Sequence, residues 1–301
     1  MTYEFREFQP DFLEKQIDLA FALTDEKKYQ PQLFLGNLKK TYLSENFDTS
    51  TRHYVFKNGE DVLTGYIVSA IEGEREGKTL ASIQAPYAVG YNKEVENLLI
   101  DKAISTLKEK NADKIVITLM ETDNQLQRFK ELNFEFAAES YQMDKRDVNS
   151  LNVFESHHEV TEYDPTVHKD IVTTIFNKSV GELFGQFFFN TYDRKGADRY
   201  SIQLILDGEE IIALGMLNQS DRRQKEFRGP MIFFNEEKEL SADKKTKMMQ
   251  SLYFTHFTKF GKENIGDVQV FIFGASITDK ESYESLGFSF DSFGRYILNL
   301  S

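Results

Sequence analysis

The octamer YESLGFSF occupies residues 283–290, and the octamer FKELNFEF occupies residues 129–136, 154 positions earlier. Both begin with an aromatic residue and have Leu at the fourth position and Phe at the sixth and eighth. Self-similarity at a long period is the sequence signature of a duplicated structural unit. The pair therefore indicates that the chain contains one unit twice. It also raises the question of why one copy begins with Tyr and the other with Phe.

Each octamer predicts the end of a short helix. Gly287 and Asn133 occupy the fifth position, and Gly and Asn are the residues that most readily adopt the left-handed conformation that ends helices. Upstream, Asn124 and Thr278 are each followed three residues later by Gln or Glu, the spacing of an N-cap and its reciprocal partner. We therefore expect two equivalent short helices, each followed by a return of Phe into the core and by a final strand.

Two further features recur in the same order. Residues 53–70 and 200–217 each place an Asn-Gly or Asp-Gly pair between two strand-like runs. This pair favours a hairpin with a type I′ turn, in which both central residues need positive φ. Strands with the pairs Ala85-Pro86 and Gly229-Pro230 follow. Because Pro cannot donate to a strand ladder, we expect a bulge or an unpaired face there.

A long helix is predicted after each of these strands. Apolar residues fall at helical spacing through residues 95–107 and again through 248–260, where Gly261 follows. Each half then reads as helices, hairpin, Pro-bearing strand, long helix, strand, short helix and final strands. Residues 144–160 are polar and weakly periodic, so we place the boundary near residue 150, with domains at 1–150 and 151–301.

The composition restricts the possible functions. A chain of 301 residues with 40% hydrophobic content is long enough for two domains with filled cores. It has no Cys, which excludes disulfides, thiolate metal sites and a Cys nucleophile. The net charge of -13 argues against broad nucleic-acid binding and fits cationic partners such as amines, although an acidic surface also simply confers solubility. No apolar run predicts a membrane span and the first residues lack signal-peptide features, so we expect a cytoplasmic protein without membrane contact.

The order of these elements resembles the GNAT superfamily of acyl-CoA-dependent N-acyltransferases. The resemblance covers nearly the whole chain as two tandem copies, and SYESLGF at residues 282–288 is the best single match. It implies an α/β (α+β) fold in which each domain is a mixed, largely antiparallel twisted sheet flanked by helices. It also implies acetyl-CoA as the cofactor and a small or peptidic amine as the acceptor, which attacks the thioester directly.

The resemblance suggests where the cofactor binds. In the family, the splayed strand before the long helix holds the pantetheine arm, which assigns this role to Phe233 and Phe234. The family's loop into that helix, with the pattern Gln/Arg-x-x-Gly-x-Gly/Ala, wraps the pyrophosphate. Here the loop has no Gly but is followed by Lys244, Lys245 and Lys247, which are able to pair with phosphates; a solvated helix face is the alternative interpretation.

The equivalent loop of the first half differs in charge. Glu94 and Glu96 stand at the entry of its long helix. Carboxylates there already satisfy the positive end of the helix dipole and would repel a pyrophosphate. We therefore expect the N-terminal domain to be a degenerate copy and the C-terminal domain to be the active one.

The difference between Tyr and Phe fits this asymmetry. In the family, the Tyr of the Tyr-x-x-Leu-Gly-Phe pattern often acts as general acid toward the leaving thiolate, and Tyr283 occupies that position. Its counterpart Phe129 has no proton to give. The alternative for Tyr283 is a packing role alone, in which it holds a helix onto the sheet as Phe129 must do.

Three functional hypotheses remain. The leading one is an acetyl-CoA-dependent N-acetyltransferase, and the competing one is a non-catalytic binding or scaffold protein that kept the fold after losing CoA binding. An acyltransferase that uses aminoacyl-tRNA is a third, against which the acidic charge argues. Two lesser candidates have a structural alternative. The face formed by Phe184, Phe187 and Phe188 is either core or the wall of an acceptor pocket, and His256 is either a relay base or a packed residue.

Overall fold

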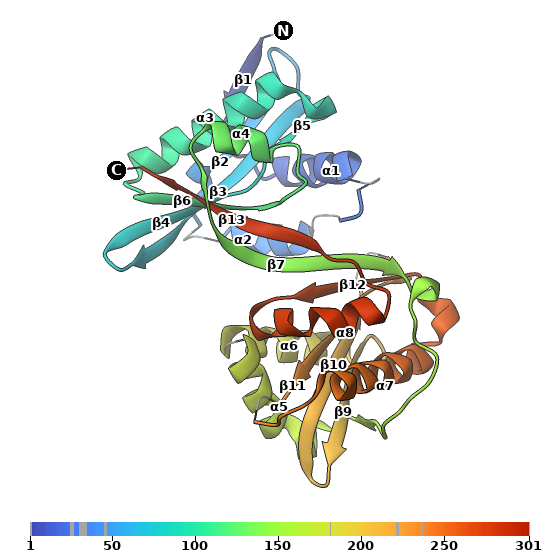
Figure 1. Cartoon of the computed structure of the whole chain (residues 1–301). Coiled ribbons are helices and arrows are strands. Elements are labelled where there is room, and N and C mark those ends of the chain that lie inside the picture. The colour runs from blue at the N-terminus through green and yellow to red at the C-terminus, as the bar shows by residue number, and fades with distance from the viewer. Residues whose placement is uncertain are drawn as a thin grey trace. The chain divides into compact units, whose positions relative to one another are not determined.

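The structure is a computed structural model (Figure 1). It describes residues 2–24, 27–29, 35–44, 47–180, 182–220, 223–235 and 237–300, apart from the side chains of residues 35–37, 179–188 and 275. The chain divides into two compact units. The N-terminal unit comprises Met1–Ser140 together with Phe293–Ser301, and the C-terminal unit comprises Tyr141–Ser292.

The N-terminal unit is built on a mixed sheet with the strand order β1-β2-β3-β4-β6-β13, in which β5 pairs with β3. The pair β4–β6 is parallel and the other neighbouring pairs are antiparallel. The strands are β1 (Tyr3–Arg6), β2 (Arg52–Lys57), β3 (Leu63–Arg75), β4 (Lys78–Ile83), β5 (Tyr87–Ala88), β6 (Lys114–Met120) and β13 (Asp291–Asn299).

Helices cover both faces of this sheet (Figure 1). On one face, α3 and α4 bury an apolar cluster that includes Leu99, Ile117 and Phe129. On the other face, α1 packs Phe12 against Tyr54 of β2. The helices of this unit are α1 (Phe12–Thr24), α2 (Leu35–Tyr42), α3 (Lys93–Glu109) and α4 (Leu126–Glu131), with the short 3-10 helices η1 (Thr49–Thr51) and η2 (Val89–Tyr91).

The C-terminal unit repeats this architecture. Its strand order is β7-β12-β11-β10-β9-β8, and β11–β12 is the parallel pair. Helices α7 and α8 pack on one face, and α5 packs on the other. The strands are β7 (Glu135–Asp147), β8 (Thr161–Glu162), β9 (Tyr200–Asp207), β10 (Glu210–Gln219), β11 (Glu226–Phe234) and β12 (Asp267–Ile272). The helices are α5 (Pro165–Val180), α6 (Glu182–Lys195), α7 (Ala242–Phe260) and α8 (Lys280–Ser285), with η3 (Val148–Ser150), η4 (Lys262–Asn264) and η5 (Gly274–Asp279). The predicted fold class, a mixed and largely antiparallel sheet flanked by helices in each half, is confirmed.

The two units differ from the predicted domains 1–150 and 151–301. Residues 142–147 of β7 pair with β12, and Val148, Leu151 and Val153 are buried in the core of the C-terminal unit. Conversely, β13 pairs with β6 from Phe293 onward, and Tyr296 is buried in the N-terminal unit. The repeat marks where each copy of the sequence ends. It does not reveal which sheet the final strand of a copy completes, because strand pairing depends on contacts that are distant in the sequence.

The hairpins and bulges follow the predictions with one correction. Both hairpins are present, as β2–β3 and β9–β10. Only the glycine of each pair, Gly59 or Gly208, has positive φ, so the expected turn with two such residues is wrong. The expected irregularity at each Pro is confirmed. The β10–β11 register shifts opposite Gly229 and Pro230, and the chain leaves β4 before Pro86 and continues as β5.

The predicted ends of the short helices are confirmed. Asn133 and Gly287 have φ of 65° and 101°. The N–H of the next residue, Phe134 or Phe288, donates to the carbonyl five residues back, on Phe129 or Tyr283. This is the Schellman motif, whose usual apolar contact joins the same two residues. Here that contact is a ring pair, with centroids 5.3 Å apart in the N-terminal unit and 6.0 Å apart in the C-terminal unit.

The predicted starts of these helices are wrong. The N-caps are Gln125 and Asp279, one residue after the expected Asn124 and Thr278. Neither N-cap side chain makes a capping hydrogen bond. In the C-terminal unit, η5 runs directly into α8, so the backbone is already helical where the cap was expected.

Candidate functional site

The sheet of the C-terminal unit opens between β11 and β12. In the described residues, β11 pairs with β12 over residues 226–228 and 267–269, and β11 then continues to Phe234 beyond the last of these pairs. Gly229 stands where the strands diverge, with φ of 98°. A Cβ at this position would lie 2.0 Å from the carbonyl oxygen of Met216, so only glycine fits. The Gly-Pro pair of the sequence thus creates a local opening in the sheet.

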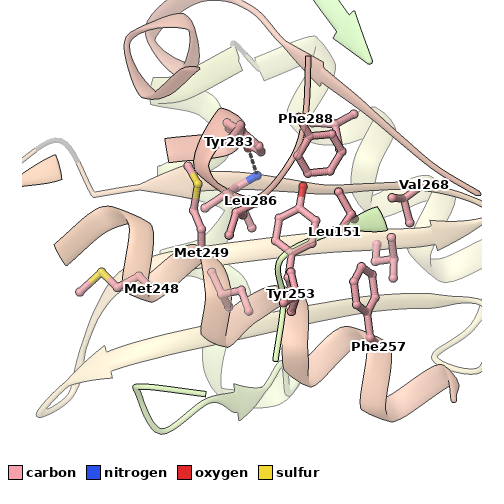
Figure 2. Packing of buried hydrophobic residues seen from close by; sticks show 14 of the residues in the cluster. Leu151, Met248, Met249, Tyr253, Phe257, Val268, Tyr283, Leu286 and Phe288 are labelled. Atoms are coloured by element: carbon pink, nitrogen blue, oxygen red, sulfur yellow. Dashed lines mark hydrogen bonds between the residues drawn. The ribbon is translucent and has the colours of Figure 1, made fainter. Parts of the chain in front are cut away.

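Two tyrosine hydroxyls satisfy the backbone groups that this opening leaves unpaired. The Tyr283 oxygen accepts a hydrogen bond from the Ile232 N–H at 3.1 Å, and the Tyr253 hydroxyl donates to the Pro230 carbonyl at 3.1 Å. Figure 2 shows the first of these bonds beside Phe288 and Leu286. Both tyrosines are fully buried. Since an unpaired buried backbone group is costly, these two side chains stabilise the opened strand.

The environment of Tyr283 keeps its hydroxyl protonated. Burial raises the pKa of the Tyr283 phenol above its usual value, although the hydrogen bond from Ile232 works in the opposite direction. Because the oxygen accepts from the Ile232 N–H, the hydroxyl retains its own hydrogen as a donor. Tyr283 is therefore a neutral acid placed at the unpaired edge of β11.

A cavity of about 360 Å³ lies at the outer end of this edge, and we call it the splay cavity. Its lining includes residues 232–234 of β11, Asn235 and residues 238–240 of the following loop, Lys245 of α7 and Asp279. Ile232 therefore both lines the cavity and donates to Tyr283. Of the residues that the resemblance assigned to the cofactor, Phe233, Phe234 and Lys245 meet here.

The three lysines of α7 have different surroundings. The Lys245 Nζ lies 2.7 Å from Asp279 Oδ1 and 5.1 Å from the centre of the Phe234 ring. Lys247 pairs with Asp243 at 2.8 Å. Lys244 and Lys247 do not line the splay cavity. Lys244 and Lys247 instead act on His158, whose pKa is lowered mainly by burial and then by the charges of these two lysines among others. Of these three lysines, Lys245 is thus the one that a group in the cavity would meet, and it already has an anionic partner.

An equivalent link occurs in the N-terminal unit. The Gln125 Nε2 donates to Glu96 Oε1 at 2.9 Å and to the Pro86 carbonyl at 3.2 Å. Glu96 and Lys245 are both the fourth residue of their long helix, while Gln125 and Asp279 both directly precede the short helix. The same two positions are therefore linked in both units, with the carboxylate on the helix in one and on the N-cap residue in the other.

The link in the N-terminal unit crosses the place where its sheet opens. There β4 and β6 pair only over residues 80–82 and 114–116, and Pro86 follows beyond the last pair. The first turn of α3 contains Glu94 and Glu96, as the sequence indicated, and the Asn92 side chain accepts from the N–H groups of Glu94 and Val95. This helix start therefore offers carboxylates and satisfied donors rather than an anion site.

Sequence reasoning did not identify the role of Gln125 and Asp279. The signal was present, because the two residues are 154 positions apart, as are the two octamers.

His256 is fully buried against Gly215 of β10, and burial lowers its pKa to about 3. It does not line the splay cavity. The side chains of Phe184, Phe187 and Phe188 lie outside the described residues.

A second cavity, of about 290 Å³, lies on the α5 side of β11, and we call it the α5 cavity. Ile171, Ile175 and Phe234 give it apolar walls. Glu210 and Glu237 also line it and pair with Lys238 and Lys178. The α5 cavity and the splay cavity share two lining residues, Phe234 and Asn235. The outer end of β11 therefore separates two cavities.

In the part of the chain that the structure describes, no group of three or more His, Asp or Glu residues is arranged to hold a metal.

Solved structures resemble the whole chain. A GCN5-related N-acetyltransferase from Sphaerobacter thermophilus aligns over 99% of this chain and 95% of its own, with a TM-score of 0.66 and 10% identity. A tandem GNAT protein from the clavulanic acid biosynthesis pathway aligns over 100% and 99%, with a TM-score of 0.70 and 8% identity. This chain has the GNAT fold.

The same fold extends to N-myristoyltransferase from Saccharomyces cerevisiae, solved with myristoyl-CoA. This enzyme aligns over 99% of this chain and 79% of its own, with a TM-score of 0.56 and 10% identity. No family model matches the sequence, and a search of curated proteins found no match. The resemblance to GNAT proteins that the sequence suggested is therefore confirmed at the level of the fold.

Proposed function

We propose that the protein is an acetyl-CoA-dependent N-acetyltransferase whose chemistry takes place in the C-terminal unit. The observation that supports this most is the position of Tyr283, a protonated hydroxyl bonded to Ile232, a residue of β11 that lines the splay cavity. The corresponding residue of the N-terminal unit, Phe129, has no hydroxyl. In this proposal, donor binding and catalysis belong to the C-terminal unit, and the N-terminal unit has a structural or acceptor-shaping role.

In the proposed reaction, the amine nitrogen attacks the thioester carbonyl, the new C–N bond forms and the C–S bond breaks. The leaving thiolate takes the proton of the Tyr283 hydroxyl, the amine gives its own proton to water, and water returns a proton to the Tyr283 phenolate. A phenol with a raised pKa is protonated at neutral pH, which is the form this step requires. Phe233 and Phe234 would contact the pantetheine arm, and Lys245 would pair with a phosphate.

The two cavities give the substrates separate places. The splay cavity would hold the donor and the α5 cavity the amine, so that the two meet at the end of β11. Glu210 and Glu237, which pair with Lys238 and Lys178, are the carboxylates that a cationic acceptor would meet in the α5 cavity. No helix of the described residues is long and apolar enough to cross a bilayer. We propose that this reaction takes place in the cytoplasm.

A second candidate is a GNAT-fold binding protein that no longer binds CoA. Lys245 is paired with Asp279, and the hydroxyls of Tyr253 and Tyr283 occupy backbone groups of the opened strand. The helix entry also lacks the glycines that would let its N–H groups approach a pyrophosphate. These features favour a protein whose own side chains already bind the groups that a CoA molecule would otherwise contact.

Calorimetric titration with acetyl-CoA separates the two candidates, because only the enzyme binds it. If no binding is detected at millimolar acetyl-CoA, the enzyme proposal is wrong. Where binding occurs, turnover with a panel of amines is measured as release of free thiol, to which this Cys-free chain adds no background. Tyr283→Phe should then lower turnover with little change in acetyl-CoA affinity. An unchanged rate would remove Tyr283 from the acid role.

A further inference from the structure

The N-terminal unit has a cavity of about 670 Å³ that lies away from the opening between β4 and β6. It is found where β1 ends beside β2, and it is lined by β1, η1, β2 and the C-terminal half of α3. We call it the edge pocket. Its volume is within the range of about 300–1,000 Å³ that is typical of small-molecule sites.

The edge pocket is more basic than the protein as a whole. Four cationic side chains, Arg6, Arg52, Lys102 and Lys110, line it together with two carboxylates, Glu7 and Glu109, whereas the whole chain has a net charge of -13. Lys110 pairs with Asp48 at 2.7 Å, and Arg6 pairs with Glu4 and Asp61. Among the described residues, no carboxylate lies within ion-pair distance of Lys102 or Arg52. Two of the four cations therefore have no carboxylate partner among the described residues.

Arg52 is the less usual of these two cations, because only 8% of it is exposed. Its guanidinium donates to the Tyr42 hydroxyl at 3.1 Å, to Thr51 Oγ1 at 2.6 Å and to the Ser69 carbonyl, all of which are neutral acceptors. A buried cation without an anionic partner is costly, and such a group is usually paired. An anion in the edge pocket would supply the missing charge.

The adjacent residue, His53, has one buried side-chain nitrogen without a partner among the described residues. It is 6% exposed, and its Nε2 has no hydrogen bond within the part of the chain that the structure describes. Buried polar atoms nearly always have one. Burial, followed by the charges of Lys102 and Arg52, lowers the pKa of His53 to about 4. A nearby anion would offset these two charges.

We propose that the edge pocket binds a small molecule that bears a carboxylate or phosphate group. Lys102 and Arg52 provide the charge, and the Thr106 hydroxyl lies on the same helix as Lys102. Phe5 and Phe8 give the pocket an apolar side for the rest of the ligand. The N-terminal unit, which lacks the tyrosine and whose own opening is crossed by Gln125, thus has a binding function that does not depend on acyl transfer.

The test uses the full chain labelled with 15N and titrated separately with inorganic phosphate and with benzoate, at constant ionic strength in chloride. We expect saturable shifts of the Arg52, His53 and Thr106 amide signals with at least one probe. Tighter binding of phosphate would identify a phosphoryl ligand, and tighter binding of benzoate a carboxylate with an apolar body. The absence of saturable shifts with both probes would overturn the proposal.

Two variants with the same charge change provide the specificity control. Lys102→Gln should weaken binding of the preferred probe by about tenfold or more, because a charge-assisted contact is lost. Lys108→Gln alters the same helix at an exposed position outside the pocket and should leave the dissociation constant unchanged. Equal effects of the two variants would show general attraction to a basic surface and would contradict a defined site.

Discussion

Tyr283 and Phe129 perform the same packing task in the two units and differ by one oxygen atom. Each ring contacts the Phe that follows the left-handed helix stop, and each is fully buried. The helix stop therefore does not require the hydroxyl. The oxygen has a separate task in the C-terminal unit, where it accepts from the N–H of Ile232. At the residue scale, Tyr at this position explains both stability and the proposed chemistry.

The first prediction concerns this hydrogen bond. Tyr283→Phe should lower the free energy of unfolding of the C-terminal unit by about 1–3 kcal/mol, because it leaves a buried N–H without a partner. Urea denaturation measures the loss. Tyr91→Phe is the matched control, since the Tyr91 hydroxyl also makes a backbone hydrogen bond, to Leu23 at 2.6 Å, but the residue is 52% exposed and water can replace the bond. Equal losses in the two variants would contradict the explanation.

The second prediction concerns pH. The pKa of His256 is about 3 in the folded chain and 6.5 for an ordinary histidine, so the unfolded chain binds more protons between these values. The contribution of neutral His256 to stability is therefore complete above pH 6.5 and is lost as the pH falls. Between pH 6.5 and 5 the loss should be about 2 kcal/mol, at 1.36 kcal/mol per pH unit.

The control for this prediction removes the titrating group. In His256→Leu the free energy of unfolding, measured by urea denaturation at several pH values, should fall less steeply below pH 6.5 than in the natural chain. His53, with a pKa lowered to about 4, titrates in the same direction in both proteins and cancels in the comparison. Identical pH dependence of the two proteins would show that His256 is not the group responsible.

At the scale of elements, the link between the long and short helices is the feature that both units share. In the N-terminal unit Gln125 joins Glu96 and Pro86, and in the C-terminal unit Asp279 joins Lys245. The link joins the first turn of the long helix to the residue before the short helix, and it therefore holds these two helices together where each sheet opens. In the C-terminal unit the link also determines whether Lys245 is free for another anion.

The third prediction follows from this competition. Asp279→Asn should strengthen acetyl-CoA binding by about threefold or more, because a phosphate no longer competes with a carboxylate for Lys245. Calorimetry measures the change. Asp243→Asn makes the same substitution at the partner of Lys247, away from the splay cavity, and should change the affinity less. Weaker binding in Asp279→Asn would instead show that Asp279 orients Lys245 for the phosphate.

At the scale of the whole molecule, the last strand belongs to the sheet of the first unit. Residues 293–299 of β13 pair with β6, and Tyr296 of β13 is 3% exposed in the N-terminal core. Residues 142–147 of β7 in turn pair with β12 of the C-terminal unit. Neither half of the sequence therefore contains a complete unit.

The fourth prediction tests this exchange. A chain that ends at Ser292 should lose protection from hydrogen exchange at the β6 amides, which lose their paired strand, while the amides of α7 remain protected. A chain that ends at Asn299 retains all the paired residues and should behave as the full chain does. Loss of protection in α7 rather than in β6 would support two halves divided near residue 150.

The sequence predicted those parts of the fold that depend on local interactions. The left-handed stops at Asn133 and Gly287, the hairpins and the irregularities at Pro86 and Pro230 all follow from the conformational limits of single residues. The N-caps were placed one residue early, because a preceding turn had already begun the helical path in the C-terminal unit. Local pattern is least informative where two local structures compete for the same residue.

The candidate site was predicted only in part, because it depends on side-chain directions and on contacts between residues that are far apart in the sequence. Sequence comparison of the two copies singled out Tyr283, and the resemblance grouped Lys244, Lys245 and Lys247. Only Lys245 of the three lines the splay cavity, since neighbouring positions on a helix face different directions. Its pairing with Asp279 joins residues 34 positions apart and is visible only in the folded chain.

The sequence by itself determined that one unit occurs twice and that its copies differ in the hydroxyl of Tyr283, because repetition and residue identity are properties of the chain. Only the tertiary structure decided which sheet each final strand completes and which donor the hydroxyl meets. It also decided which of the three lysines of α7 lines the splay cavity. These depend on distances between segments far apart in the sequence, where pairing and burial are settled by the fold as a whole rather than by any local pattern.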